Sequence, residues 1–195
     1  MRFPVPQHVK NFELPCFEFN LDTLNEEACS LVGHGQQLPE VVIVDKQTLA
    51  SITTDIEPSR IELHPIFNVP WLPEEVMRHV LIHEHIHLLI QPREVEDGVT
   101  KDHPPEFWDV ERKLSPFARP AWYWMRQEWG DLLVRKEKEE KTIVKRIWKK
   151  RRRESLVFRT KMYLEAEVFP IPESTFSWQN ALQAFEYEPD IDPLF

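Results

Sequence analysis

The stretch VLIHEHIHLLI, from Val80 to Ile90, decides how this sequence is interpreted. It places histidines at every second position, His83, His85 and His87, with Glu84 after the first. On a strand, all three histidines would share one face. On a helix, only His83 and His87 would lie one turn apart on the same side. Either arrangement can bind a metal, so the secondary structure of this stretch determines the predicted site.

The flanking residues favour a helix. Pro73, followed by two glutamates, is a typical helix start, because proline suits the first turn and acidic side chains suit the helix dipole. The segment ends at Pro92, and residues 73–91 are too many for a typical strand. Apolar residues also recur at helical spacing. We therefore predict a helix over 73–91. The alternation from Leu81 to Leu89 leaves open a strand-borne site with all three histidines as ligands.

On a helix, residues 83–87 form the HExxH arrangement, in which two imidazoles one turn apart can share a tetrahedral cation. Glu84 can then take a proton from a metal-activated water and pass it to a leaving amine. His103, at a predicted loop–helix junction, is the best candidate for a third ligand. The competing carboxylates are Glu94, Glu96, Glu106 and Glu111. The sequence thus predicts one Zn²⁺ bound by His83, His87 and His103.

Three other histidines need an interpretation. His79 extends the row of metal-binding histidines back by one turn, and we expect it to support the ligands or to lie on the surface rather than to act as a fourth donor. His85 points to the other side of the helix, near Leu81 and Leu88, and is predicted to be a hydrogen-bonded core histidine or a partly exposed one rather than a ligand. His64 ends a predicted strand and is expected on the surface.

The stretch EEVMRHVLIHEHIHLLI, followed by DHPPEFW, resembles the SprT-like metallopeptidases and their smaller YgjP-type relatives. In those families HExxH is followed by a third zinc-binding histidine in a short motif that contains aromatic residues. The resemblance implies zinc binding by His83, His87 and His103 and catalysis by Glu84, with Phe107 and Trp108 as the aromatic pair. The 15 residues between His87 and His103 are similar to the SprT-like spacing.

The resemblance covers residues 21–114 and implies a zincin-like core. It has limits: a cysteine zinc ribbon, common after the SprT-like core, is impossible here because the chain has two cysteines. Nothing from Phe117 onward has a counterpart in these families. The link of the SprT-like family to DNA–protein crosslink repair is therefore not carried over.

Composition indicates a globular protein, with 42% hydrophobic and 11% aromatic residues. The first 15 residues contain no apolar stretch typical of a signal peptide, and no run approaches the length of a membrane span, so we expect a cytoplasmic protein without a membrane partner. Cys16 and Cys29 are the only cysteines and are not in CxxC spacing. This fits a reduced compartment and rules out cysteine-based zinc sites.

The predicted fold class is α+β, a zincin-like core with a small mixed sheet and an active-site helix, followed by a helical and β extension. Helices are expected at 21–32, capped by Asp22 or Thr23, and at 103–115. A buried strand is expected at 40–45, an edge strand at 60–64 and a polar loop at 93–102. An extended peptide substrate could add to that edge strand. Further elements are one or two helices over 119–155 with a break at Gly130, a strand or hairpin at 156–168, and a short helix at 174–185.

We divide the chain into a metallopeptidase domain at 1–117, a helical basic segment at 118–155, and a β element with an acidic tail at 156–195. Between Lys141 and Lys161 there are ten basic residues and one acid, although the whole chain has a net charge of −9. The aromatic cluster at 122–129 is expected to pack in the core rather than to stack on bases.

The basic segment has three interpretations: a solvated helix face paired with the acids of 137–140, a contact with nucleic acid, or a dock for an acidic protein partner. The residues that would make such contacts are Lys145, Arg146, Lys149, Lys150, Arg151, Arg152 and Arg153. Two functions follow from the sequence. The first is a zinc metallopeptidase acting on a peptide or protein. The alternative is a nucleic-acid-associated protein with a structural or vestigial metal site.

Overall fold

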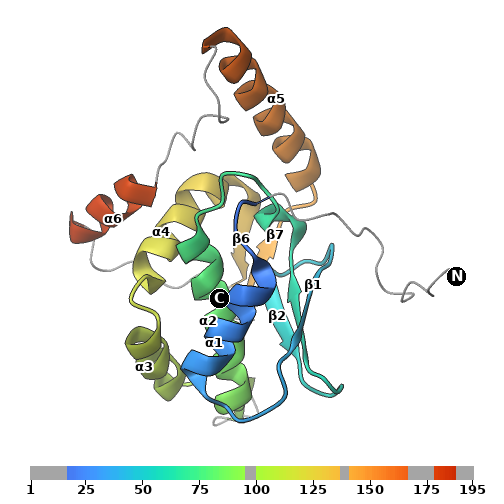
Figure 1. The fold of residues 1–195 in the computed structure, drawn as a ribbon, viewed down its shortest axis with the longest axis vertical. Helices are drawn as coiled ribbons and strands as arrows, with labels where there is room; N and C mark the ends of the chain where they lie inside the picture. The colour runs from blue at the N-terminus through green and yellow to red at the C-terminus, as the bar shows by residue number, and fades with distance from the viewer. Residues whose placement is uncertain (1–16, 95–99, 137–140, 167–177, 188–195) are drawn as a thin grey trace, which may run out of the picture.

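The structure is a computed structural model that describes residues 17–94, 100–136, 141–166 and 178–187 (Figure 1). The helices are α1 (Leu21–Val32), η1 (Pro65–Phe67), α2 (Glu74–Leu89), α3 (Pro105–Leu114), α4 (Ala118–Trp129), η3 (Gly130–Leu132), α5 (Trp148–Ala166) and α6 (Trp178–Tyr187). The strands are β1 (Glu40–Ile43), β2 (Ala50–Thr53), β3 (Arg60–Leu63), β4 (Arg93–Glu94), β5 (Thr100–Lys101), β6 (Leu133–Lys136) and β7 (Lys141–Val144). The predicted α+β class is confirmed at this level.

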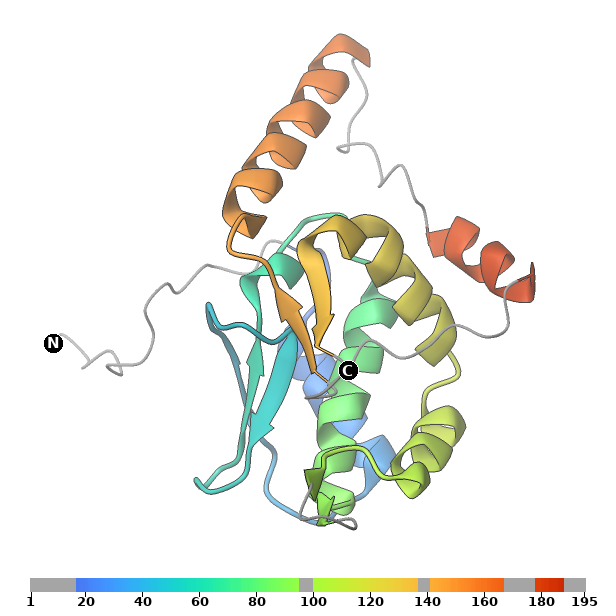
Figure 2. The same cartoon turned by 180° about the vertical axis from the view of Figure 1, so that it is seen from behind.

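Helix α2 is the centre of the fold. It contacts α1, α3, α4 and strand β2, and Figures 1 and 2 show the sheet on one side of it and α3 and α4 on the other. The prediction of a helix over 73–91 is confirmed, with Pro73 at the N-cap and Glu74 and Glu75 in the first turn. Eleven of its 16 residues are buried, so this helix is surrounded by protein on most of its circumference.

Helix α1 begins where predicted, at Leu21, but its N-cap lies two positions before Asp22, the nearer of the two predicted caps. The side chain of Asn20 accepts hydrogen bonds from the backbone N–H groups of Asp22 and Thr23, so Asn20 is the N-cap and the expectation of Asp22 or Thr23 is wrong. An amide oxygen at the N-cap satisfies backbone donors that have no partner within the helix. Gly33, with φ of 65°, ends the helix.

The main sheet has the order β1-β3-β2. Strand β3 pairs in parallel with β1 and antiparallel with β2, so Ile61 lies opposite both Val41 and Ile52. The prediction that residues 60–64 form an edge strand is therefore wrong. Pro65 is compatible with the central position because it begins η1, just beyond the end of the strand.

For the segment after α4, the predicted break is confirmed and the predicted helix beyond it is wrong. Helix α4 ends at Trp129 and Gly130 begins η3, so the predicted break is confirmed. Residues 133–136 and 141–144 then pair as an antiparallel hairpin, not as a helix. The hairpin joins the sheet just before β2, through a bridge between Thr48 and Ile143.

Residues 156–166 belong to α5, so the predicted strand or hairpin over 156–168 is wrong for this part; residues 167 and 168 lie outside the described ranges. The apolar alternation that suggested a strand lies on a helix, and two of its first residues are exposed. Val157 and Phe158 are 63% and 58% exposed. Figures 1 and 2 show α5 extending away from the body of the molecule.

One core joins the two sides of the predicted boundary at residue 117. Trp122 and Trp124 of α4 and Ala181 of α6 are buried in the same cluster as α1, the main sheet and α2. The aromatic residues of α4 therefore pack in the core, as predicted, with Tyr123 only partly buried. The short helix predicted at 174–185 corresponds to α6, and most of the acidic tail lies outside the described residues. Among the described helices, none is both long and apolar enough to cross a membrane.

Candidate metal centre

Three histidines from two parts of the chain converge beside α2. His83 and His87 project from the same face of the helix, and His103 lies two residues before the start of α3. The His103 Nε2 atom is 3.1 Å from His83 Nε2 and 3.2 Å from His87 Nε2. The short β4–β5 ladder, which pairs Arg93 with Lys101, turns the chain back to α2 and brings His103 there. Residues 95–99 of the predicted polar loop lie outside the described ranges.

The spacing of these nitrogens suits a shared metal ion. A tetrahedral ion with metal–nitrogen bonds of about 2.0–2.1 Å holds its nitrogen ligands about 3.3–3.4 Å apart. The two observed distances are close to this value. Among the described residues, His83, His87 and His103 are one of two groups whose donor atoms lie close enough together to hold a metal ion. The geometry thus shows a possible metal-binding cluster and leaves the type of ion open.

A buried carboxylate orients the first histidine. Glu111 of α3 is 2% exposed, and its Oε1 atom is 2.7 Å from His83 Nδ1. A carboxylate there accepts the Nδ1 proton and leaves the Nε2 lone pair directed toward His87 and His103. The sequence suggests Glu111 only as a competing ligand. In the structure its carboxylate contacts His83 instead, a contact that depends on the packing of α3 against α2.

The other competing carboxylates have different positions. Glu106 is on the surface of α3 and lies 3.7 Å from Arg93. Glu94 is in β4, and Glu96 lies outside the described residues. The rings of Phe107 and Trp108 pack against His103 with centroid distances of 4.8 and 5.0 Å. The aromatic pair therefore encloses the third histidine.

Burial keeps the three imidazoles neutral. Desolvation lowers the pKa of His87 to about 4 and that of His103 to about 2, and it lowers the pKa of His83 well below its ordinary value. Neighbouring histidines add to the effect at His83 and His103, because a second positive charge nearby is unfavourable. Neutral imidazoles are the form that binds metals, so the ligands are in the required state at neutral pH.

Glu84 follows His83 on α2, and it lines a cavity together with His83, His87 and His103. Its side chain is 2% exposed, and burial raises its pKa to about 8, against the opposing effect of Lys46. Lys46 itself contacts Ser51 Oγ and lies 3.4 Å from Glu62 Oε2. A carboxyl group whose pKa lies near neutrality is suited to accept and return a proton.

The cavity has a volume of about 270 Å³ and is partly open. One wall is formed by His83, Glu84, His87 and His103, and the opposite wall by strand β2 and the residues just before it. Thr142 of β7 also lines it. Strand β2 was not predicted, because its sequence ASIT is short and lacks a clear alternation. The strand beside the cavity is therefore β2 and not β3.

Three further histidines, His64, His79 and His85, are buried. His79 bonds through Nδ1 to Ser115 Oγ at 2.9 Å and packs edge-on against Trp122. It lies beside His83 and is 1% exposed, so the alternative of a surface position is wrong. His85 lies on the opposite face of α2, buried and hydrogen-bonded as predicted, to Asn25 and to His34. His64 is 1% exposed, so the expectation of a surface position is wrong. Its Nδ1 accepts the Ile66 N–H at the start of η1.

The seven basic residues singled out in the sequence lie in the turn after β7 and along the first part of α5. Lys149 pairs with Asp45 at 2.7 Å, Arg151 pairs with Asp131 at 3.0 Å, and the Lys145 ammonium donates to the Asp131 carbonyl. Lys150 lies 3.8 Å from Glu154. None of the seven lines the cavity beside the histidines. The acids in these ion pairs lie just after β1, in η3 and in α5. The acids of 137–140 lie outside the described residues.

The hydrogen bond from His83 to Glu111 leads to a first prediction. Glu111→Ala should weaken zinc binding by about 10–100-fold, because the imidazole loses the partner that fixes its proton and its orientation. Glu111→Gln retains an acceptor and should have a smaller effect. Zinc affinity can be measured by competition with a chromophoric chelator. Glu106→Ala, an exposed glutamate on the same helix, is the matched control and should bind zinc like the unaltered protein.

Comparison of the chain with protein-family models, with curated proteins and with solved structures gives no match.

Proposed function

We propose that this protein is a zinc-dependent metallopeptidase with a zincin-like core. The observation that carries the proposal is the convergence of three neutral imidazoles at one cavity, with the buried carboxyl group of Glu84 on the same helix. Three histidine ligands that leave one side open are typical of catalytic zinc rather than structural zinc, which is usually enclosed by four protein ligands.

The donor set fits zinc better than harder cations. Imidazole nitrogen suits Zn²⁺ and related ions, whereas Mg²⁺ and Ca²⁺ prefer oxygen ligands. His83, His87 and His103 would bind the ion through their Nε2 atoms. When bound, zinc would increase the acidity of water and polarise a carbonyl group. The remaining chemistry belongs to side chains of this chain.

Glu84 would act as the general base and then as the general acid. It would accept the proton that the attacking water loses and donate it to the nitrogen of the leaving amine. Burial makes Glu84 easier to protonate, and a nearby cation would favour its carboxylate form, so the two influences oppose each other. This balance suits a group that must take up and release a proton in each turnover.

Strand β2 would hold the substrate. It pairs with β3 along one edge and lines the cavity. An extended peptide can add to a strand edge through main-chain hydrogen bonds. The substrate would therefore lie along β2 and not along residues 60–64, because β3 is in the middle of the sheet.

A nucleic-acid-associated function has less support. Several of the basic side chains of α5 and the preceding turn are paired with acids of the same chain, which reduces the positive charge available to phosphates.

Dependence on zinc tests the proposed activity. The zinc-loaded full chain should cleave a mixture of unstructured peptides, with new termini detected by mass spectrometry. Cleavage should stop when zinc is chelated and return when zinc is restored. His103→Ala, purified in the same way, should be inactive. Cleavage that persists after chelation, or that is retained by His103→Ala, would contradict the proposal, as would a zinc-loaded chain that leaves every peptide intact.

A further inference from the structure

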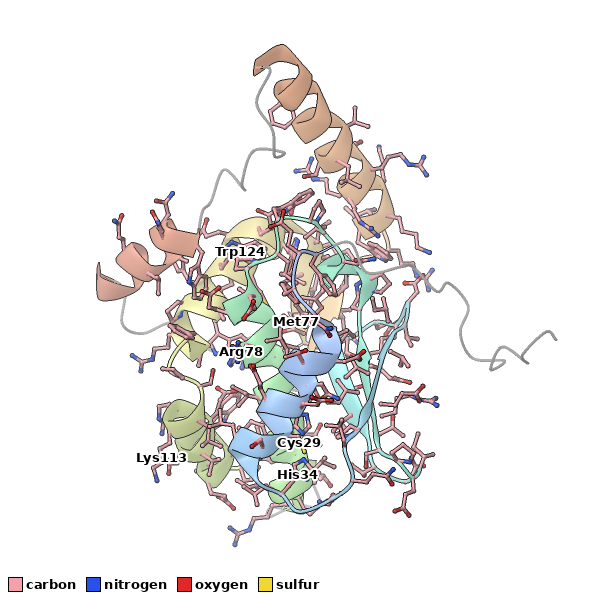
Figure 3. All side chains as sticks on the ribbon, in the orientation of Figure 1. Cys29, His34, Met77, Arg78, Lys113 and Trp124 are labelled. Carbon is pink, nitrogen blue, oxygen red and sulfur yellow. The ribbon has the colours of Figure 1, made fainter. Side chains whose placement is uncertain are left out.

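A second cluster of potential metal ligands lies on the face of α2 opposite His83 and His87. It consists of Cys29 on α1, His34 just after α1, and His85 on α2, and the donor atoms all lie within 4.8 Å of one another. The His34 Nε2 atom is 3.6 Å from Cys29 Sγ and 2.9 Å from His85 Nδ1. Figure 3 labels Cys29 and His34 together near the end of α1. Two cysteines in the chain are too few for a cysteine-based zinc site. A site that combines one cysteine with two histidines needs only one of them.

Two glycines place His34 in this cluster. Gly33 has φ of 65° and Gly35 has φ of 74°, a left-handed backbone that other residues rarely adopt. The Gly33 N–H donates to the carbonyl of Cys29 at 2.9 Å, which ends α1 directly after the turn that carries the cysteine. The chain then turns back, and His34 lies against α1 and α2 instead of continuing into solvent.

A chain of hydrogen bonds directs a lone pair of His85 into the cluster. The carbonyl of Pro39 can only accept, so the 2.9 Å contact assigns Nδ2 of Asn25 as its donor. The Oδ1 atom of Asn25 therefore faces His85 Nε2, 2.9 Å away, and accepts its proton. In neutral imidazole only one nitrogen carries a proton. The Nδ1 atom of His85 thus presents a lone pair to His34 and Cys29, and its ring is held as a metal ligand commonly is.

We propose that Cys29, His34 and His85 form a second metal site for a borderline or soft cation of the zinc and copper(I) class. A thiolate with two imidazoles is the kind of donor set that these ions prefer over Mg²⁺ or Ca²⁺. Around tetrahedral zinc, a sulfur and a nitrogen ligand lie about 3.6 Å apart, which is the separation of Cys29 Sγ and His34 Nε2. This inference is independent of the proposed peptidase activity, since the three residues do not line the catalytic cavity.

Binding requires small changes in the cluster. The two histidine nitrogens must separate by a few tenths of an ångström, to about 3.3–3.4 Å, and exchange their direct hydrogen bond for the shared ion. The His34 proton must move to Nδ1, which now lies 3.1 Å from the Gln36 N–H, so this contact must open. Burial raises the pKa of the Cys29 thiol, and metal binding must release its proton. We therefore expect this site to bind more weakly than the three-histidine site.

Cobalt titration distinguishes the two sites. Co²⁺ bound to a thiolate gives an intense near-ultraviolet charge-transfer absorption, and a site made only of histidines does not. The metal-free, reduced full chain should bind two Co²⁺ ions, and the band should grow mainly with the second equivalent. His103→Ala should lose the first site and keep the band. Cys29→Ser and His34→Ala should lose the band and still bind one ion, with the fold checked by circular dichroism.

Cys16→Ser is the matched control, because it removes the other cysteine and should keep both ions and the band. Absence of the band from the unaltered protein at millimolar Co²⁺, with the three-histidine site filled, would overturn the proposal. A band that survives Cys29→Ser would overturn it too, since another thiolate would then be the ligand. A band lost in Cys29→Ser but intact in His34→Ala would overturn the three-residue assignment. Failure of peptide hydrolysis would affect none of these results.

Discussion

Replacement of Glu84 by glutamine should lower kcat/KM for peptide hydrolysis by about 10²–10⁴-fold, the usual contribution of a positioned general acid–base group. Glutamine has nearly the same shape but cannot accept and return a proton. The side chain is 2% exposed, and burial raises its pKa to about 8. A neutral amide therefore replaces a group whose charge is already costly, and the fold should be retained. Zinc stoichiometry should stay at that of the unaltered protein, because the proposed ligands are histidines.

The matched control for this variant is Glu62→Gln. Glu62 lies 3.4 Å from Lys46, whose charge also acts on Glu84, but it does not line the cavity. Glu62→Gln removes a negative charge nearby and should hydrolyse peptides at close to the normal rate. Full activity in Glu84→Gln would refute the proposed mechanism. Loss of zinc together with activity would mean that Glu84 supports the metal rather than the proton transfer.

Lowering the pH from 7 to 5.5 should destabilise the metal-free protein by several kcal/mol. Burial lowers the pKa of His64 and His79 to about 4, well below the ordinary 6.5, and the same direction holds for His83, His87 and His103. The unfolded chain binds protons at these histidines below pH 6.5, and the folded chain does not until pH approaches 4. Each buried neutral histidine therefore contributes its full share to the free energy of unfolding above pH 6.5. This contribution falls as the pH drops below 6.5, by about 1 kcal/mol per histidine at pH 5.5.

Two carboxyl groups act in the opposite direction. Burial raises the pKa of Glu84 and Glu111, so the folded chain holds their protons more tightly than the unfolded chain, and acid favours folding at these two positions. They offset only part of the histidine effect. The free energy of unfolding, measured by urea titration with chelator at both pH values, tests the net sign.

His64→Asn isolates one histidine in that experiment. Its Nδ1 atom accepts the Ile66 N–H at 2.9 Å, and an asparagine oxygen can accept the same bond at the start of η1. In this variant the free energy of unfolding should fall by about 1 kcal/mol less between pH 7 and pH 5.5 than in the unaltered protein. If the unaltered protein is as stable at pH 5.5 as at pH 7, or more stable, the assignment of neutral buried histidines is contradicted.

Several features could be predicted from the sequence because they depend on neighbours in the chain. Pro73 and two glutamates begin α2, and the i and i+4 spacing places His83 and His87 on one face. The same spacing places His85 on the other face. The ends of α1 and α4 likewise follow from Gly33 and Gly130.

Two predictions were wrong because they depend on which strand pairs with the segment, and neither alternation nor a proline shows this. The alternating residues from 156 to 166 belong to helix α5, since alternation by itself supplies no strand to pair with. Pro65 suggested an edge strand, yet β3 became central when the short and unrecognised β2 paired with it. A proline beyond the end of a strand removes no hydrogen bond from the ladder.

By itself, then, the sequence determined the central helix, the pair of histidines with Glu84 beside them, and the α+β class. Only the tertiary structure decided which residues meet that helix. His103, Glu111 and strand β2 surround one face, and Cys29 and His34 lie against the other. The physical reason is separation along the chain: spacing within a helix is fixed by its 3.6-residue turn, whereas contacts between segments 16 to 51 residues apart depend on how whole elements pack.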